Sequence, residues 1–343
     1  MKSPAFLPRA VLLASLALLG HGCAYYNTFF HARQAYNQAE KARAEAPREN
    51  QESIGLDLYE QAMKKCAKVI VEYPDSRWVD DAILLMGKCF YARGDYLAAF
   101  RKFDEILLYY EKSDLASEAR FWKAKTLVEL DRYDEAVPSL QKFREGKKND
   151  LRGEALYLLA VVEYERENYG AAAEGLELYL DQDKEARGND DVLRLLGDCY
   201  RKTGERAKAL SVYQERLQDP LLETSARLEA SLDRADILAE EGRFEDAYGT
   251  LDDLLSEMSS REDSLRIDLH RGKAYLAEGR TDEAVDLFRS SLALASSSPA
   301  GGEIAFLLGD LYLNEFDNKD SAASAFRTAA AAPGDEAQKA EAS

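Results

Sequence analysis

The chain contains few of the residues on which metal sites and acid–base catalysis depend. It has three histidines and four cysteines among 343 residues, and no two cysteines form a C-x-x-C pair. Zinc-ribbon and thioredoxin-type sites therefore lack their spacing. Glycine and proline are also scarce, at 20 and 8 residues. This composition argues against a turn-dense all-β fold and favours long helices.

Basic residues are outnumbered by acidic ones. Lysine and arginine total 45, against 63 aspartate and glutamate residues, which gives a net charge of −18. Nucleic-acid binding draws much of its affinity from basic side chains that neutralise phosphates, and adsorption to an anionic membrane needs the same charge. We therefore expect no nucleic-acid partner. The hydrophobic content of 46% excludes wholesale disorder.

No familiar catalytic motif is present. The sequence lacks G-x-S-x-G, H-E-x-x-H, G-x-G-x-x-G and a phosphate-binding P-loop. His31 and His270 are too far apart along a repeat array to share one site. We therefore predict a protein that is not an enzyme, with no catalytic residue, no cofactor, no bound metal and no small-molecule substrate.

Residues 1–22 have the plan of a secretory signal peptide. Lys2 and Arg9 supply positive charge, an apolar run follows over Ala10–Leu19, and small residues precede Cys23. The run is shorter than the roughly 20 apolar residues of a transmembrane helix. A cysteine at this place resembles the lipobox of bacterial lipoproteins, although the leucine of the box stands one position early. The resemblance implies that Cys23 is acylated and becomes the mature N-terminus. Cleavage by the ordinary signal peptidase, with Cys23 as a plain thiol, is the alternative.

An aromatic cluster and three further cysteines each have two interpretations. The cluster either rests at the lipid interface, where amphipathic rings prefer to lie, or caps the first hairpin, and it consists of Tyr25, Tyr26, Phe29 and Phe30. An oxidising compartment would permit a disulfide between Cys66 and Cys89. The alternative, which we favour, is that these two and Cys199 are small core residues on helices.

The strongest pattern is an internal repeat of about 37 residues. A small residue recurs at intervals of 36 to 38 positions, at Gly87, Ala124, Ala160, Gly197, Ala235, Gly272 and Gly309. About 12 positions after each comes an alanine: Ala99, Ala136, Ala172, Ala209, Ala247, Ala284 and Ala322. Four positions further lies a bulky residue: Phe103, Leu140, Leu176, Tyr213, Leu251, Phe288 and Phe326. Seven units in one frame indicate a solenoid of helical hairpins.

The periodicity also predicts how the hairpins pack. A small residue on the first helix lets the second helix approach closely, and the bulky residue packs on the next unit. Turn motifs such as RGDY and EGRF supply glycines that can take the left-handed conformation ending a helix. An eighth hairpin is expected before the seven, with helices over 26–46 and 55–73. The segment 296–302 has the composition of a linker.

This pattern resembles the tetratricopeptide repeat (TPR). Gly87, Phe90, Gly94, Ala99 and Phe103 occupy positions of its consensus. The resemblance implies an all-α, right-handed superhelical solenoid of about eight helix-turn-helix repeats. The expected organisation is a signal peptide over 1–22, a lipidated N-terminus and first hairpin over 23–78, a seven-unit array over 79–332 and a flexible tail over 333–343.

In TPR proteins the first helices line a concave groove, and the resemblance implies one here. Carried over position by position, the residues expected to bind a partner are Lys88, Tyr91, Phe121, Lys125, Tyr157, Tyr164, Arg194 and Arg201. Aromatic residues and arginine are the types that anchor interfaces, and such a groove would suit an extended or helical peptide. The alternative is that Phe121 and Tyr157 belong to the core and that the basic residues pair with neighbouring acids.

A narrower resemblance covers residues 56–145. The junction YPDS-x-x-x-DDA-x-x-x-x-G is similar to that of the BamD-like lipoproteins, the TPR component of the outer-membrane β-barrel assembly machinery. It implies a scaffold held on the outer membrane by its lipid anchor, facing the periplasm and binding other envelope proteins. The alternative is a TPR scaffold of another envelope complex, such as cell-wall, secretion or motility machinery.

Overall fold

A computed structural model describes residues 9–47, 53–145, 151–183, 185–295 and 298–333. For residues 9–26 it gives the helix without its side chains. The side chain of Cys23, the first eight residues of the expected signal peptide and all but the first residue of the expected tail therefore lie outside the described part. So do the side chains of Tyr25 and Tyr26.

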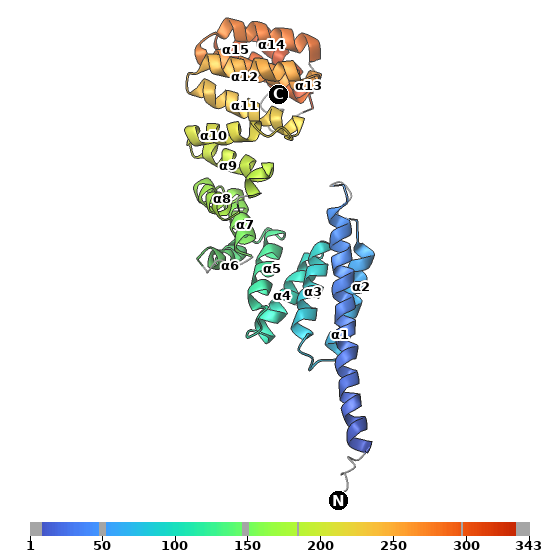
Figure 1. Ribbon diagram of the computed structural model, residues 1–343. Coiled ribbons are helices and arrows are strands. Elements are labelled where there is room, and N and C mark those ends of the chain that lie inside the picture. Colours follow the sequence, from blue (N-terminus) through green and yellow to red (C-terminus); the bar gives the residue numbers. More distant parts are fainter. Residues whose placement is uncertain (1–8, 48–52, 146–150, 184, 296–297, 334–343) are drawn as a thin grey trace, which may run out of the picture. The chain divides into compact units, whose positions relative to one another are not determined.

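The chain divides into two compact units, one ending at Glu167 and the other beginning at Asn168. The helices of the first unit (Figure 1) are α1 (Arg9–Ala44), α2 (Leu56–Glu72), α3 (Val79–Ala92), α4 (Tyr96–Tyr109), α5 (Ala116–Val128), α6 (Tyr133–Glu145) and α7 (Arg152–Glu165). Those of the second unit are α8 (Tyr169–Gln182), the short 3₁₀-helix η2 (Glu185–Gly188), α9 (Asp190–Lys202), α10 (Arg206–Leu217), α11 (Thr224–Glu240), α12 (Phe244–Glu257), α13 (Arg261–Glu278), α14 (Thr281–Ala295), α15 (Pro299–Asn314) and α16 (Lys319–Ala331). No strand occurs in the described residues, and the predicted all-α helix-turn-helix solenoid is confirmed.

One backbone position in the turns recurs in a left-handed conformation. Glycine occupies it in four hairpins, at Gly94, Gly204, Gly242 and Gly279, with φ between 73° and 83°. The corresponding turns of the other three repeats place a residue with a side chain there: Asp131 (φ 55°), Glu167 (φ 61°) and Asp317 (φ 45°). The left-handed residue ends each first helix and lets the second begin within two to four residues.

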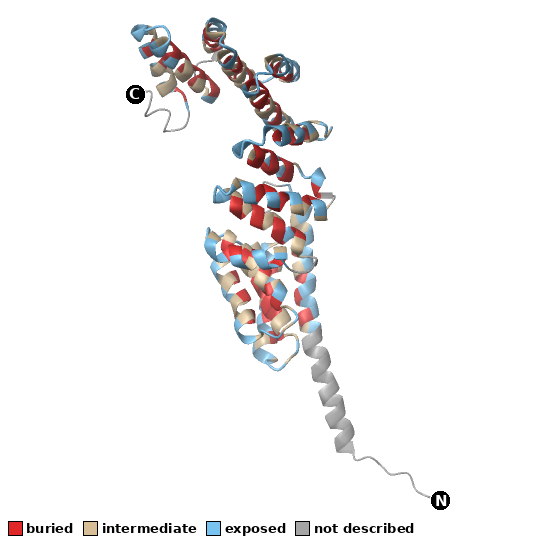
Figure 2. Cartoon of the chain, turned by 90° about the vertical axis from the view of Figure 1, so that its left-hand side faces the viewer, coloured by how far each residue is buried: buried red, intermediate tan, exposed pale blue. Residues whose placement is uncertain are grey.

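The core of each hairpin forms where its small residue meets its bulky one. The ring of Phe103 on α4 lies over Gly87 on α3, so that a Cβ added to Gly87 would stand 2.5 Å from the ring. The bulky residue therefore packs first against its own hairpin, while Phe103 also shares a cluster with Ala119 of α5. Figure 2 shows buried positions recurring along each described helix of the solenoid.

The first hairpin is closed at its N-terminal side by an aromatic contact. Phe29 of α1 is buried and its ring stacks on Trp78 at 5.6 Å between centroids, while Phe30 is half exposed. Phe29 therefore caps the hairpin, as one of the two interpretations expected.

The cysteines with described side chains are buried. Cys66, Cys89 and Cys199 are free thiols in the helical core. Burial raises the pKa of Cys66, and it raises the pKa values of Cys89 and Cys199 to about 12. All three therefore remain protonated and unreactive in the folded state at neutral pH.

The linker interpretation of residues 298–302 was wrong. Helix α15 begins at Pro299, and the Ser298 hydroxyl accepts a hydrogen bond from the amide of Gly301 at 3.1 Å. Gly301 and Gly302 are buried, and the end of α16 packs against Gly302, where an added Cβ would stand 2.8 Å from that of Ala332. The small residues serve close packing. Residues 296–297 lie outside the described part.

Candidate functional site

The residues predicted to bind a partner lie on the first helices of four repeats. Lys88 and Tyr91 belong to α3, Phe121 and Lys125 to α5, Tyr157 and Tyr164 to α7, and Arg194 and Arg201 to α9. The first six fall in the first unit and the two arginines in the second. The structure thus divides them into separate groups.

In the first unit, three of them gather around Trp122 of α5. The ammonium groups of Lys88 and Lys125 lie 5.2 and 5.1 Å from the centroid of the indole ring, and the Tyr91 ring meets it edge-on at 5.3 Å. Lys125 also lies 5.6 Å above the Tyr91 ring. These four residues are called the Trp122 cluster. Contacts of cations with aromatic faces contribute roughly 0.5–2 kcal/mol each.

The charges of the Trp122 cluster are matched by acids of the following hairpins. Lys88 donates to Glu118, Lys125 donates to Glu154 at 2.5 Å, and the Tyr91 hydroxyl donates to Glu129 at 2.6 Å. Burial, reinforced by the bond to Glu129, raises the pKa of Tyr91 above its usual range. The basic residues pair with neighbouring acids, as the alternative interpretation expected. The Trp122 cluster is therefore an aromatic surface whose lysine charges are neutralised by carboxylates of the same unit.

The same pairing recurs in the second unit. Lys273 of α13 donates to Glu303 of α15 at 2.7 Å. It occupies the position in its repeat that Lys88 and Lys125 occupy in theirs. A lysine at this repeat position therefore links successive hairpins through an ion pair with a glutamate on the next first helix.

Placing Phe121 on a partner-facing surface was wrong. Its side chain is fully buried in a cluster with Phe143 and Leu140, and its ring meets Phe143 at 5.9 Å. The neighbouring Trp122, one position later, is half-buried and packs against the edge of the same core. Tyr157 and Tyr164 are half-buried on α7 and each has an interaction within the protein.

In the second unit, a pocket of about 300 Å³ brings Arg194 and Arg201 together. It collects side chains from the first helices of three successive hairpins, α9, α11 and α13, with one from α10. Its lining residues are Arg194, Asp198, Arg201, Arg216, Glu229, Leu232, Asp233, Arg266 and His270. We call it the arginine pocket.

Some charges of the arginine pocket are paired within the protein. Arg201 donates to Asp198 at 3.0 Å, and the ring nitrogen Nδ1 of His270 hydrogen-bonds to Asp236 at 2.6 Å. Burial raises the pKa of Asp233, against the opposing effect of Arg201. An ionised carboxylate at this depth in the pocket is therefore destabilised by burial.

Other charges of the pocket have no partner. Within the described residues, Arg194, Arg266 and Glu229 form no hydrogen bond or ion pair with another protein group. Arg194 and Glu229 are exposed, and Arg266 is half-buried. Two guanidinium groups and one carboxylate are thus available to charged groups of opposite sign on another molecule.

The inner wall of the pocket is fixed by a buried ion pair. The guanidinium of Arg216 donates from Nε and Nη2 to the two carboxylate oxygens of Asp190, at 2.7 and 2.9 Å, and its side chain is 0% exposed. Its Nη1 is buried without a partner in the described structure. The bidentate pair holds α10 against the start of α9 and so positions the helix that carries Arg194 and Arg201.

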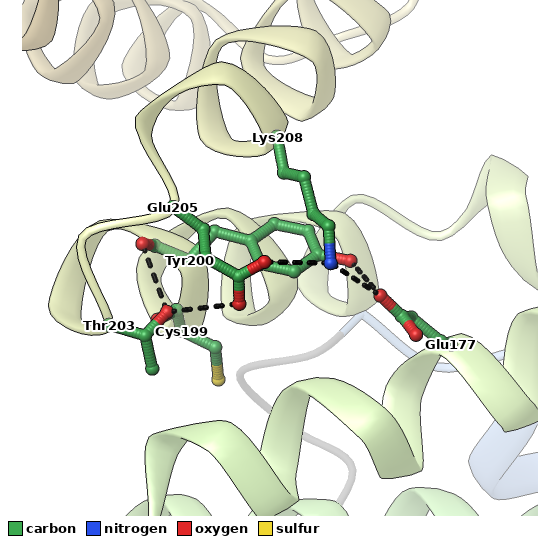
Figure 3. Close-up of polar contacts among 6 residues, drawn as sticks. All are labelled: Glu177, Cys199, Tyr200, Thr203, Glu205 and Lys208. Atoms are coloured by element: carbon green, nitrogen blue, oxygen red, sulfur yellow. Dashed lines mark hydrogen bonds and ion pairs between the residues drawn. The ribbon is translucent and has the colours of Figure 1, made fainter.

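A neighbouring polar cluster, drawn in Figure 3, is satisfied internally. The Tyr200 hydroxyl donates to Glu177 of α8 at 2.5 Å. Lys208 of α10 lies 2.7 Å from Glu205 and 3.5 Å from Glu177, and its ammonium stands 4.9 Å from the Tyr200 ring centroid. Burial and the bond to Glu177 raise the pKa of Tyr200. This cluster joins α8, α9 and α10 and offers no unpaired charge.

The sequence held a signal for part of what the groove prediction missed. Carrying the same positions into the repeats of Ala235 and Gly272 reaches Glu229, Leu232 and Arg266, which line the arginine pocket. Trp122 lies at a position that the consensus does not assign to the groove. The available signal was that Trp122 lies in the sequence between Lys88 and Lys125, two lysines 37 residues apart.

The described residues contain no group of three or more histidine, cysteine, aspartate or glutamate side chains arranged to hold a metal ion. Among them there is also no helix with the length and apolar character needed to cross a membrane.

Two family models, both described as tetratricopeptide repeat, match the chain. One matches residues 84–150, 123–187 and 269–336, and the other matches residues 192–222. Together they cover more than half of the sequence. No curated protein sequence matches it.

Several solved structures have a similar fold. A tetratricopeptide repeat protein from Parabacteroides merdae has a TM-score of 0.52 at 16% identity, over 77% of this chain and 96% of its own. The C-terminal part of a TPR repeat-containing protein from Cytophaga hutchinsonii has a TM-score of 0.52 at 13% identity, over 71% and 93%. The structure of Naa15/Naa10 bound to HypK-THB has a TM-score of 0.50 at 18% identity, over 90% of this chain and 42% of that one. At these identities the likeness concerns the fold.

Proposed function

The chain belongs to the tetratricopeptide-repeat family, and on this basis we propose that it is a non-enzymatic scaffold that binds partner proteins through the first helices of its hairpins. The observation that carries the proposal is the arginine pocket. Three charged side chains from successive first helices have no partner of opposite charge within the described residues: Arg194, Glu229 and Arg266. The structure of Naa15/Naa10 bound to HypK-THB is one case of a similar fold within an assembly of proteins.

The chemistry of the pocket suits a protein segment that carries charges of both signs. Arg194 and Arg266 can each receive a carboxylate in a bidentate, charge-assisted pair, and Glu229 can receive a lysine or arginine. The wall of the pocket is set by the Arg216–Asp190 pair, so little side-chain freedom is lost there on binding. The Trp122 cluster, with its charges compensated, offers stacking area and few free charges.

The test is a quantitative comparison of two charge-matched variants of the tagged full-length protein. Arg194→Glu/Arg266→Glu reverses the unpaired charges of the pocket. Arg289→Glu/Arg327→Glu makes the same change at two exposed arginines on the second helices α14 and α16. Proteins cross-linked to the wild type in cells should be recovered with the second variant and lost with the first. Equal recovery from both would place the interface elsewhere.

We further propose that the protein is anchored by acyl chains on Cys23 and faces the periplasm from the outer membrane. The support is in the sequence: a positive start, the apolar run Ala10–Leu19 and a cysteine after small residues. Several acyl chains together give stable attachment, where one would be marginal. Mass spectrometry of the mature N-terminus tests this. Acylated Cys23, and release of Cys23→Ala into the soluble fraction, are expected; an unmodified cysteine would contradict it.

We propose that the scaffold serves outer-membrane β-barrel assembly. The support is the junction YPDS-x-x-x-DDA-x-x-x-x-G within residues 56–145. A pull-down from detergent-solubilised envelope should recover a large β-barrel insertase with the wild type. A variant altered at Lys88, Tyr91, Lys125 and Arg201 should recover less of it. Recovery of an unrelated complex would keep the scaffold and assign it to other envelope machinery.

A further inference from the structure

One end of the first unit exposes apolar side chains at the ends of two second helices. Val71, near the end of α2, is 77% exposed, and Leu108 and Tyr109, at the end of α4, are 65% and 73% exposed. Phe30 of α1 is also exposed. These four residues are called the exposed edge. Figure 1 shows the C-terminal ends of α2 and α4 at the same end of the unit, so these exposed apolar side chains share that end.

Contacts within the unit hold the parts of this edge together. The stack of Phe29 on Trp78 joins α1 to the loop between α2 and α3. The Ser113 hydroxyl donates to Asp80 at 2.6 Å, which joins the loop after α4 to the start of α3. Figure 1 shows both loops at the same end of the unit, and the loop between α2 and α3 lies next to α1.

The edge lies close to the proposed anchor along the same helix. Helix α1 begins at Arg9 and passes the edge at Phe29 and Phe30. Cys23 precedes Phe30 by seven residues, which at 1.5 Å per residue is about 10 Å of helix. An acylated Cys23 would therefore bring the bilayer surface within reach of the edge.

We propose that the exposed edge rests on the interfacial layer of the lipid bilayer and fixes how the first unit stands on the membrane. The inference rests on the proposed acylation of Cys23. Tyrosine and large apolar side chains suit this layer, which is apolar on one side and wet on the other. The adjoining loops carry charges of both signs, Asp75 and Glu111 beside Arg77 and Lys112. The contact is therefore apolar in origin and does not require anionic lipid.

The test uses the full-length protein, purified with its anchor and reconstituted into phosphatidylcholine vesicles. Cysteine is introduced at Tyr109 or at Leu97 and labelled with an environment-sensitive fluorophore. Leu97 is the matched control, because it is 61% exposed on the same helix α4 but lies about 18 Å away, near its other end. The unsubstituted protein reports any label taken up by Cys23, since the other three cysteines are buried.

The label at Tyr109→Cys should shift its emission to the blue in vesicles and be quenched several-fold more by brominated lipid than the label at Leu97→Cys. Anionic vesicles should give the same result. Equal quenching at the two positions would overturn the proposal. A blue shift at 109 without lipid quenching would overturn it in favour of a protein covering the edge. Failure of the wild type to co-sediment with vesicles would instead overturn the anchoring, and with it this placement.

Discussion

The ring of Tyr213 on α10 lies against the backbone of Gly197 on α9, so that a Cβ added at Gly197 would stand 2.8 Å from Cε1 of the ring. Tyr213 is buried, so its ring is held in place by the surrounding core. Gly197→Ala should therefore lower the free energy of unfolding by about 1–3 kcal/mol, the range for overpacking a filled core. Chemical denaturation of the purified variant measures the loss.

The matched control is Gly249→Ala in α12 of the same unit, where an added Cβ meets nothing within 4 Å. Replacing a helical glycine by alanine in open space should raise stability by roughly 0.5–1 kcal/mol. Effects of the same sign at Gly197 and Gly249 would contradict the role given to the close helix approach.

The recurring left-handed turn position gives a second prediction. Glu167 adopts φ 61°, where a side chain on Cβ is strained, whereas Gly94 holds the corresponding position in its hairpin at φ 77°. Glu167→Gly should raise the free energy of unfolding by about 0.5–1 kcal/mol, because strain of 1–2 kcal/mol is partly offset by the greater freedom of the unfolded chain. Gly94→Ala should lower it by about 1 kcal/mol. Thermal melts of both variants test these two stability changes, and a loss of stability in Glu167→Gly would contradict the strain assigned to Glu167.

The buried pair of Arg216 and Asp190 should show strong coupling. Asp190→Ala leaves the guanidinium of Arg216 buried without its carboxylate, at a cost of about 3 kcal/mol. Adding Arg216→Leu removes the stranded charge, so the double variant should be more stable than Asp190→Ala alone. Denaturation of the two single variants and the double variant completes the cycle. Additive losses would show that the pair is not coupled.

Asp233 in the arginine pocket should give a pH-dependent stability difference. Burial raises its pKa above the ordinary value of 3.8, although Arg201 and His270 act in the opposite direction. An acid with a raised pKa in the folded state destabilises that state once it ionises, so the penalty is absent below pH 3.8 and complete above the folded pKa. Asp233→Asn should therefore be more stable than the wild type near pH 7, and the difference should shrink as the pH falls towards 3.8.

Denaturant midpoints across this pH range test the prediction. Asp286→Asn, which alters an exposed acid of the same unit, is the matched control and should show a smaller change. A difference at Asp233 that stays constant with pH would rule out ionisation as its cause.

The repeat architecture could be predicted from the sequence because its physical cause is local. A small residue that must admit a bulky one sixteen positions later leaves a visible pattern, and Gly87 with Phe103 is one such pair. The turn glycines mark the boundary between the helices in four of the seven repeats. The second helix of the first hairpin, expected over 55–73, begins and ends within one residue of these bounds.

The candidate site was less accessible to the same reasoning. Neighbours on a helix differ in direction by about 100°. The consensus gave Phe121 to the groove, whereas the structure buries Phe121 and leaves Trp122 half-buried among the lysines. The arginine pocket depends on side chains from three hairpins, and no single repeat encodes which of its charges remain unpaired. The composition of residues 298–302 suggested a linker, because close packing and flexibility call for the same small residues.

The helices of each unit contact only near neighbours, and in every pair with substantial contact at most one other helix intervenes along the chain. A polypeptide released residue by residue from its N-terminus can therefore complete each hairpin against the one just before it. No apolar face has to stay open for a segment that has not yet been made, so few aggregation-prone intermediates are exposed during synthesis. The order of biosynthesis and the order of assembly can then be the same.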